Sequence, residues 1–226
     1  MKISILGTAG IPASYGGFET LAENLVRYHQ ANNLPDRLIV YCSAKGKADS
    51  LPDNCFGAEL QYIELDANGV SSIVYDVVSM FNAVRRGCDV ILLLGVSGAI
   101  ALPFMRLLSK VRIVTNIDGI EWRREKWKGL AKWFLRFSEF LAVKFSHEVI
   151  ADNAGIATYV VKSYGRTCHV IAYGGDHAIL ASPKPYEGAS LPSRYALALC
   201  RIEPENNVAM ILESFARKVD MPLVLS

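Results

Sequence analysis

Short apolar runs alternate along the chain with longer segments in which apolar residues recur every three or four positions. Several of the short runs are almost continuous Val, Ile and Leu, as in strands that helices cover on both faces. This alternation is typical of parallel βαβ units. The runs predict strands at Ile3–Leu6, Leu38–Cys42, Leu60–Leu65, Val90–Leu94, Arg112–Ile117, Glu148–Ala151 and His169–Ala172.

The longer segments predict amphipathic helices between these strands. In the helix over 130–145, one apolar stripe is expected to pack on the sheet and the opposite face to meet water. The stripe consists of Leu130, Phe134, Phe137, Leu141 and Phe145, and the opposite face of Lys128, Lys132, Arg136 and Glu139. The other helices are expected at Phe18–Asn32, Ser71–Arg86, Ala99–Ser109 and Ala154–Tyr164.

The pattern changes after residue 182. Prolines, serines and a glycine gather in 183–194, which is the composition of a linker. Beyond it, Tyr195–Leu199, Asn206–Lys218 and Pro222–Leu225 predict one more strand–helix–strand unit. A single crossover cannot bury both faces of its sheet. We therefore expect an α/β protein, with a Rossmann-like doubly wound parallel sheet over 1–182 and the truncated start of a second Rossmann-like domain over 195–226.

Composition narrows the function classes. Hydrophobic residues make up 51% of the 226 and charged residues 20%, which is ordinary for a globular protein and excludes a disordered one. A net charge of +2 gives no reason to expect nucleic-acid binding. The five cysteines are widely spaced and odd in number, which argues against a disulfide framework or zinc site and favours a reducing cytoplasm. The uncharged run Val90–Met105 is interrupted by Gly and Pro and is shorter than the roughly 20 residues of a membrane span.

A glycine-rich turn follows the first strand. Gly16 and Gly17 precede the first helix, where backbone N–H groups and the helix end favour an anion such as a diphosphate. Tyr15 and Glu19 flank them and are candidates for lining a sugar site. The turn is too long for a dinucleotide fingerprint, and no acid ends the second strand to hold a ribose. The alternative is that these glycines serve only the turn.

A second polar segment follows the strand Arg112–Ile117. Asp118 and Glu121 are the candidate catalytic carboxylates. Asn116 and Trp122 could line a sugar-binding site, because polar groups hydrogen-bond sugar hydroxyls and Trp faces stack on sugar rings. The carboxyl ends of parallel strands are where open α/β sheets bind ligands. The alternative is a solvated loop whose tryptophans anchor the next helix.

Two further positions are candidates for lining the ligand site, and one basic stretch is a candidate for contact with a membrane. Asn153 and Asp176 also follow predicted strands, and each is equally compatible with an ordinary turn. Between 123 and 144, lysines and arginines outnumber acids, so this surface could rest on anionic lipid headgroups or could simply be solvated.

Together these motifs resemble a known family. The stretches 10–20, 118–122 and 126–127 are similar to those of bacterial rhamnosyltransferase-like proteins, which carry an N-terminal domain of unknown function. Those proteins belong with the retaining family-four glycosyltransferases of GT-B fold. The resemblance implies two facing Rossmann-like domains, with the acceptor mostly on the first and the nucleotide sugar mostly on the second. It also implies that Gly16, Gly17 and Arg201 bind the donor diphosphate, without a metal or cofactor.

This sequence departs from the family pattern in two places. No His stands near Asp118, and 203–207 holds no Lys after Arg201. The expected function is transfer of a sugar, with rhamnose the first candidate, from a nucleoside diphosphate to a hydroxyl of a cell-surface glycan or lipid-linked acceptor. We expect this in the cytoplasm, with peripheral contact to the inner membrane surface, and expect the fragment alone to be inactive. The alternatives are a nucleotide-sugar epimerase of GT-B build, a non-catalytic module that binds a glycan or partner, and a dinucleotide-binding oxidoreductase.

Overall fold

The computed structural model describes residues 1–14, 16–46, 51–124, 127–176, 179, 190–200, 202, 204–218 and 220–225. Its contacts divide the chain into two units. The first comprises Met1–Trp122 and Gly129–Tyr173, and the second comprises Arg123–Lys128 and Gly174–Ser226.

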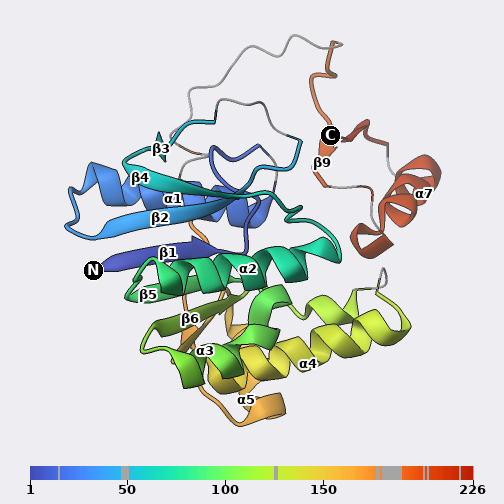
Figure 1. The fold of residues 1–226 in the computed structure, drawn as a ribbon. Helices are drawn as coiled ribbons and strands as arrows, with labels where there is room; N and C mark the ends of the chain where they lie inside the picture. The colour runs from blue at the N-terminus through green and yellow to red at the C-terminus, as the bar shows by residue number, and fades with distance from the viewer. Residues whose placement is uncertain are drawn as a thin grey trace. The chain divides into compact units, whose positions relative to one another are not determined.

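The first unit is built on one eight-stranded sheet of order β3-β4-β2-β1-β5-β6-β7-β8 (Figure 1). All neighbouring strands are parallel except β3 and β4. From β1 the chain first builds outward through β2 and β4, then crosses to β5 and builds in the other direction, which is the doubly wound arrangement expected. The strands are β1 (Lys2–Leu6), β2 (Arg37–Ser43), β3 (Asn54–Cys55), β4 (Ala58–Ile63), β5 (Val90–Leu94), β6 (Arg112–Ile117), β7 (Glu148–Ala151) and β8 (His169–Val170).

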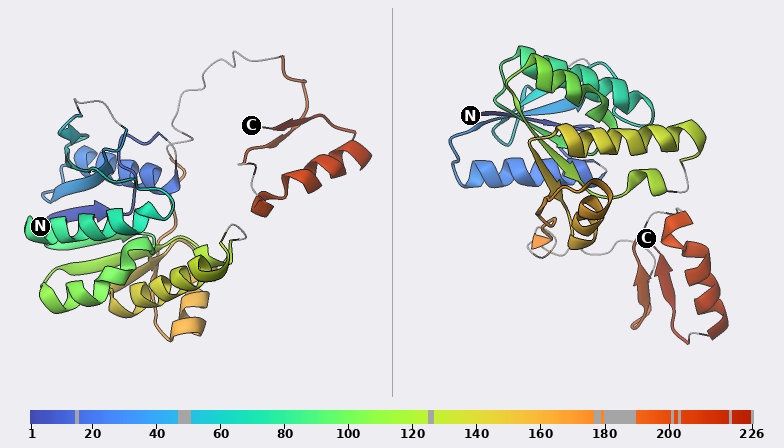
Figure 2. Two further views of the ribbon diagram at one scale, coloured as in Figure 1. Left: turned by 45° about the vertical axis from the view of Figure 1, so that its right-hand side comes forward. Right: turned by 90° about the horizontal axis from the view of Figure 1, so that it is seen from below.

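Helices cover both faces of this sheet unequally. Helix α1 lies on one face, and α2, α3 and α4 lie side by side on the other (Figure 2). Helix α5 packs beside α4, and its Val160 joins the core on that side. The helices are α1 (Gly17–Ala31), α2 (Ser71–Arg85), α3 (Leu102–Leu108), α4 (Gly129–Phe145) and α5 (Ala154–Tyr164), with short 3-10 helices η1 (Ser97–Ala101) and η2 (Glu121–Arg123).

Alternate side chains of the strands enter two separate core clusters. On the α1 face, Ile5 and Val40 pack with Ala22 and Val26 of the helix. On the other face, Leu6, Ile39 and Ile113 pack with side chains of α2, η1, α3 and α4. The period of two along each strand therefore serves both faces, which explains the nearly continuous apolar runs of the sequence.

Three local features differ from the sequence expectations. The short β3, which pairs antiparallel to β4, was not predicted because two residues carry no periodic signal. The expected helix Ala99–Ser109 divides into η1 and α3, with Pro103 in the first turn of α3. The strand expected at His169–Ala172 is shorter, at His169–Val170.

The expected orientation of α4 was right only in part. Leu141 and Phe145 pack in the core and Arg136 is exposed, as predicted. By contrast, Leu130, assigned to the packed stripe, is 87% exposed, and Glu139, assigned to the solvated face, is 1% exposed. The buried side of α4 instead includes Leu135, Ser138 and Ala142. Glu139 can be buried because three polar hydrogens converge on its Oε1, from Tyr159, Tyr164 and Trp122.

In the second unit, β9 (Ala196–Ala198) and β10 (Leu223–Leu225) pair in parallel, joined by η3 (Pro204–Asn206) and α7 (Val208–Lys218). This confirms the predicted strand–helix–strand unit. The expected linker lies partly at 183–189, outside the described residues, so the domain boundary at 182 stays a prediction. In the part of the chain that is described, no helix combines the length and apolarity that crossing a bilayer requires.

Candidate functional site

The candidate residues of the first unit gather at one edge of its sheet. Strands β1, β5, β6 and β7 run in the same direction, so their carboxyl ends and the loops that follow share this edge. Ligands of open α/β sheets bind at such an edge, near the point where the chain reverses its direction of building. Here that point lies between β1 and β5.

The glycine-rich turn between β1 and α1 is held by carboxylates of α1 itself. Glu19 Oε1 accepts hydrogen bonds from the Thr8 hydroxyl at 3.1 Å and from the Ala9 amide at 2.8 Å. Glu23 Oε2 accepts one from the Ala13 amide at 2.6 Å. The turn is therefore preorganised before any ligand binds, because ionised acceptors form strong hydrogen bonds with backbone N–H groups.

Gly7 and Gly16 are two of the glycines in this turn that geometry requires. Gly7 has φ 86°, and a Cβ there would lie 2.0 Å from the carbonyl oxygen of Leu94 in β5. Gly16, the residue before α1, has φ 122°, and a Cβ there would lie 1.9 Å from Glu19 Oε2. Gly17 differs from both, since it is the first residue of α1 and a Cβ there would meet no atom within 4 Å. Gly17 is thus the open side of the predicted diphosphate site.

A hollow of about 380 Å³ lies beside this turn. Ser43 and Lys45 line it from the end of β2, and Asp66 and Asn68 from the loop after β4. Lys45 Nζ lies 3.4 Å from Asp66 Oδ2. The backbone N–H of Asn68 is the main cause that lowers the pKa of Asp66, so this carboxyl group is ionised at neutral pH. The walls therefore offer a cation, carboxylates and an amide, a mixture suited to a polyhydroxyl ligand.

Glu19 also lines this hollow, together with the turn residues Gly10, Pro12 and Ser14. Glu19 therefore lies where the sequence placed it, beside a candidate ligand site. Its Oε1 is already engaged with the turn, which leaves Oε2, next to Gly16, as the oxygen nearer to the helix end.

A second polar cluster lies at the ends of β6, β7 and β8. Asn116 is 3% exposed, and its Nδ2 donates a hydrogen bond to the Tyr173 hydroxyl at 2.8 Å. Its Oδ1 is buried and has no hydrogen-bond partner among the described residues. A buried acceptor without a partner costs stability, and a donor group of a ligand would satisfy it.

Charge and burial alter the titration of this cluster. Burial is the largest cause that raises the pKa of Tyr173 to about 12, and the charge of Asp118 adds to it. The charge of Asp152 acts in the same direction, more weakly. Burial also raises the pKa of the Asp152 carboxyl group. Asp118 and Asp152 thus both lie within electrostatic reach of the Tyr173 hydroxyl, and groups with perturbed pKa values often mark functional sites.

Trp122 is directed toward α4 and α5. Its indole N–H lies 3.4 Å from Glu139 Oε1 and 3.3 Å from the Tyr159 hydroxyl. The cations of Lys132 and Arg136 lie over its ring, 5.7 and 5.3 Å from the centroid. These contacts give Trp122 the anchoring role that was the alternative at the sequence level, and its place in a sugar site stays a prediction.

The other predicted residues fall in different settings. Glu121 is half-buried in η2. Asn153 caps the N-terminus of α5, with its Oδ1 accepting a hydrogen bond from the Ile156 amide at 2.9 Å. Asp176 is exposed and belongs to the second unit. Tyr15 and Arg201 lie outside the described residues. Within the described residues, no group of three or more His, Cys, Asp or Glu side chains is arranged to hold a metal ion.

The structure brings together Gly16, Gly17 and Glu19 at one end of this edge, and Asn116 and Asp118 at the other. Asp152 and Tyr173 lie in the same two strand-end segments as Asn153 and Asp176, which the sequence had indicated as a possible lining of the ligand site, but they were not among its candidate site residues. The sequence analysis also passed over the polar lining of the hollow. Their signal was position alone, since Ser43, Lys45, Asp66 and Asn68 all come at or just after strand ends.

Solved structures with this fold are much longer and distant in sequence. Sucrose-phosphate synthase from Thermosynechococcus elongatus superimposes with a TM-score of 0.72 and 10% identity, over 99% of this chain and 61% of that chain. The lipopolysaccharide outer core galactosyltransferase WaaB gives 0.56 and 15%, over 100% and 60%. UDP-GlcNAc 2-epimerase from Methanocaldococcus jannaschii gives 0.51 and 12%, over 100% and 65%. The chain thus spans roughly three fifths of each.

These likenesses confirm the fold that the sequence predicted, the Rossmann-like N-terminal half of the GT-B type. No curated protein matches the chain significantly. Residues 1–176 match a family known as Domain of unknown function (DUF1972). That match covers both polar clusters at the sheet edge and most of the chain, and the chain therefore belongs to the DUF1972 family.

Proposed function

We propose that the chain is the acceptor-side part of a glycosyltransferase that moves a sugar from a nucleoside diphosphate to a hydroxyl group. The observation that carries this proposal is the sheet edge itself. A helix end with an open Gly17 and a cluster containing the unpartnered Asn116 Oδ1 lie along one edge of one parallel sheet. The fold supports it, because two structures that share it are named as a synthase of sucrose phosphate and a galactosyltransferase.

One end of this sheet edge would bind the donor diphosphate, and the other would bind the acceptor. The N-terminal end of α1 would face the donor diphosphate, since its partial positive charge favours an anion. Glu19 already occupies the Ala9 amide, so the diphosphate would approach from the side of Gly17. Arg201, Tyr15 and Asp176 are further predicted contacts, the first to the diphosphate and the others to the sugars.

Asp118 and Asn116 would position the acceptor hydroxyl, with Glu121, Trp122 and Asn153 as the remaining predicted contacts. In the reaction, the acceptor oxygen bonds to the anomeric carbon while the bond from that carbon to the diphosphate oxygen breaks. The acceptor proton passes to the departing phosphate. We propose retention of configuration and no metal or cofactor, as the family resemblance implies.

Because the chain spans about three fifths of the length of its structural neighbours, we propose the activity for a chain of their full length. We expect the 226 residues alone to be inactive. Rhamnose is the first donor sugar to test, and a cell-surface glycan or lipid-linked acceptor the first acceptor. The odd number of widely spaced cysteines supports work in the cytoplasm, and a lipid-linked acceptor would bring the enzyme to a membrane surface.

The test is sugar transfer by the full-length protein and by its Asp118→Asn variant. We expect the variant to lose about 10²–10³-fold in kcat/KM, because the amide cannot hold the acceptor hydroxyl as the carboxylate does. Glu148→Gln is the matched control, since Glu148 begins β7 at the opposite edge of the sheet. Its kcat/KM should stay within about twofold of the wild type. Equal activity of Asp118→Asn and wild type would remove Asp118 from the site.

A nucleotide-sugar epimerase is the second candidate, since one neighbour carries that name. An epimerase converts the donor in the absence of any acceptor, whereas a transferase needs the acceptor. Titration calorimetry with dTDP, UDP and GDP precedes both assays. Tight nucleotide binding by the 226 residues alone would contradict a donor site that is shared with further residues. A non-catalytic module would be favoured if no sugar transfer is detected and the Asp118→Asn variant binds glycan as well as the wild type does.

A further inference from the structure

Helices α2, α3 and α4 expose apolar side chains in continuous stripes. On α2, Val74, Val78 and Phe81 are exposed at spacings of four and three, and on α3 Phe104, Leu107 and Leu108 are exposed, Leu107 at 82%. On α4 the stripe consists of Leu130, Trp133, Phe137 and Phe140. Single exposed apolar residues are normal, but stripes on three neighbouring helices form a patch of the kind that marks a docking surface.

The aromatic residues of α4 form a layer of their own. The rings of Trp133 and Phe137 stack with centroids 5.5 Å apart and planes 6° apart, and Phe137 stacks on Phe140 at 6.5 Å. Stacking of this kind holds the rings in place on the surface, although their outer faces meet water. The stripe is therefore an ordered apolar surface.

Charge on these three helices has only one sign at the surface. Their two acids, Asp76 and Glu139, are each 1% exposed and face the protein interior. The exposed charged residues of the three helices are all cations: Arg85, Arg106, Lys132, Arg136 and Lys144. None of the five forms an ion pair with a described residue, whereas Arg27, Arg37 and Arg86 elsewhere do. Their other contacts are with uncharged or ring groups: Lys132 and Arg136 lie over the Trp122 ring, and Arg106 contacts the His147 ring.

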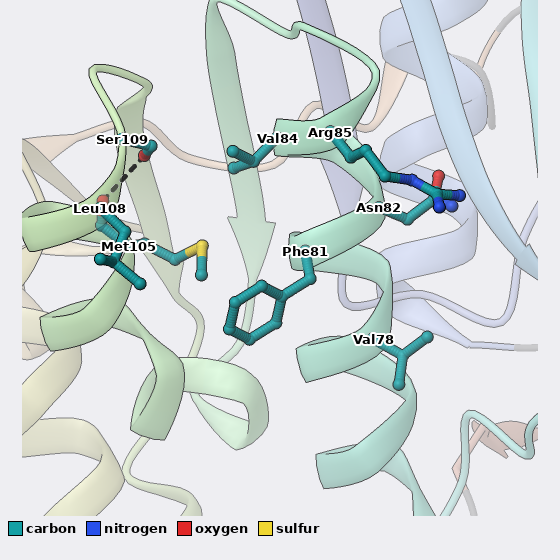
Figure 3. Close-up of a pocket in the computed structure, with 8 residues that line it drawn as sticks. All are labelled: Val78, Phe81, Asn82, Val84, Arg85, Met105, Leu108 and Ser109. Atoms are coloured by element: carbon teal, nitrogen blue, oxygen red, sulfur yellow. Dashed lines mark hydrogen bonds between the residues drawn. The ribbon is translucent and has the colours of Figure 1, made fainter.

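A hollow of about 510 Å³ lies between α2 and α3 within this patch (Figure 3). Figure 3 shows the Phe81 ring and the Met105 side chain directed into the space between the two helices, with Val84 above them. Arg85 also contributes to the lining, but Figure 3 shows its guanidinium group directed away from α3. The side chains directed into this groove are apolar, which suits a lipid acyl chain.

We propose that the face of α2, α3 and α4 docks on an anionic lipid bilayer. The apolar stripes would enter the boundary between headgroups and acyl chains, and the exposed cations, which have no acidic partner among the described residues, would lie among lipid phosphates. Trp133 suits this position, because tryptophan is enriched where an apolar layer meets water. The inference extends the proposed lipid-linked acceptor, but the docking is measurable without any sugar transfer.

A second copy of the chain fits this face less well. In a two-fold dimer the same patch meets itself, so the cations would lie opposite cations. The three helices offer no exposed acid to pair with them. Charge complementarity therefore favours an anionic surface over self-association.

The test is flotation of the 226-residue chain with two kinds of vesicle, phosphatidylcholine alone and phosphatidylcholine with phosphatidylglycerol. We expect binding to the anionic vesicles, weakened by added salt, and little binding to the neutral ones. The double variant Phe104→Ser, Leu107→Ser should lower the partition coefficient by about tenfold or more, since two large apolar side chains no longer enter the lipid. Arg136→Ala should lower it roughly fivefold.

Matched controls come from other surfaces. Leu25→Ser with Tyr28→Ser removes two exposed apolar residues from α1, on the opposite face of the sheet, and Lys162→Ala removes an exposed cation from α5. Both should leave the partition coefficient unchanged. Absence of binding to anionic vesicles, or equal loss in the α1 control, would overturn the proposal. A dimer that the Phe104, Leu107 variant dissociates, without vesicle binding, would assign the face to self-association instead. Sugar transfer measured with a soluble acceptor tests the proposed function separately.

Discussion

Glu19 joins the turn after β1 to the first turn of α1. One of its oxygens accepts from Thr8 and Ala9, and the other lies where a Cβ on Gly16 would have to be. The requirement for glycine at 16 is thus set by the protein's own carboxylate as well as by φ. The sequence indicated Gly16 through its position before a predicted helix. It did not indicate the contacts of Glu19 with the turn, because these depend on how the turn folds back onto the helix.

Gly16→Ala and Gly17→Ala separate the two roles of this glycine pair. We expect Gly16→Ala to lower the free energy of unfolding by about 1–3 kcal/mol, because φ 122° is strained for alanine and its Cβ would collide with Glu19. Gly17→Ala, with helical backbone and open space, should change it by less than about 1 kcal/mol. Urea denaturation followed by circular dichroism measures both.

The same pair tests the diphosphate site. If Gly17→Ala stays stable but weakens nucleotide binding, the open side of the helix end contacts the ligand. Equal stability of the two variants would show that the turn does not hold Glu19 against Gly16 as described.

At the scale of elements, Asp76 fastens α2 to the segment that follows β5. It accepts hydrogen bonds from the Ser97 hydroxyl and the Gly98 amide, and a Cβ on Gly98 would lie 2.5 Å from that of Asp76. Next to it, the Tyr75 hydroxyl donates to the Thr8 carbonyl oxygen at 3.1 Å. One turn of α2 thereby supports the loops after both β1 and β5.

Asp76 makes stability depend on pH. Burial raises its pKa to about 7, and the hydrogen bonds from Ser97 and Gly98 offset part of this effect. The folded protein then holds the proton more tightly than the unfolded chain. The resulting stabilisation is complete below about pH 4 and is lost as the pH rises through about 7.

In the wild type, the free energy of unfolding should fall by up to about 1.4 kcal/mol per pH unit across that window. We expect the Asp76→Asn variant to lack this decline, because it has no carboxyl group to titrate. Urea denaturation at a series of pH values measures it. Glu64→Gln, at an exposed carboxylate, should leave the decline unchanged. Parallel pH profiles of the wild type and Asp76→Asn would contradict the assignment.

Elements with a strong apolar period were predictable from the sequence, and contacts between them were not. The bounds of β5, β7 and α5 were predicted as the structure has them, since their apolar residues and flanking turns are local signals. The buried face of α4 was predicted only in part, because the burial of Glu139 depends on hydroxyl groups of α5. In the site, strand ends indicated Asn116 and Asp118, but the approach of Tyr173 follows from the pairing of β7 with β8.

At the scale of the molecule, both core clusters of the sheet lie within the first unit. We expect a chain ending at residue 182 to unfold in one cooperative urea transition, with the midpoint that the 226-residue chain shows for this unit. Tryptophan fluorescence and far-ultraviolet circular dichroism should give coincident curves. A non-cooperative transition would place the domain boundary elsewhere.

The order of strands in the sheet determines whether the sheet can form while the chain is still being synthesised. After β1, the strands β2 and β4 extend the sheet on one side, and β5, β6, β7 and β8 then extend it on the other in the order in which they leave the ribosome. No strand must enter between two that are already paired. The sheet can therefore assemble during synthesis, each new strand finding the open edge left by an earlier one.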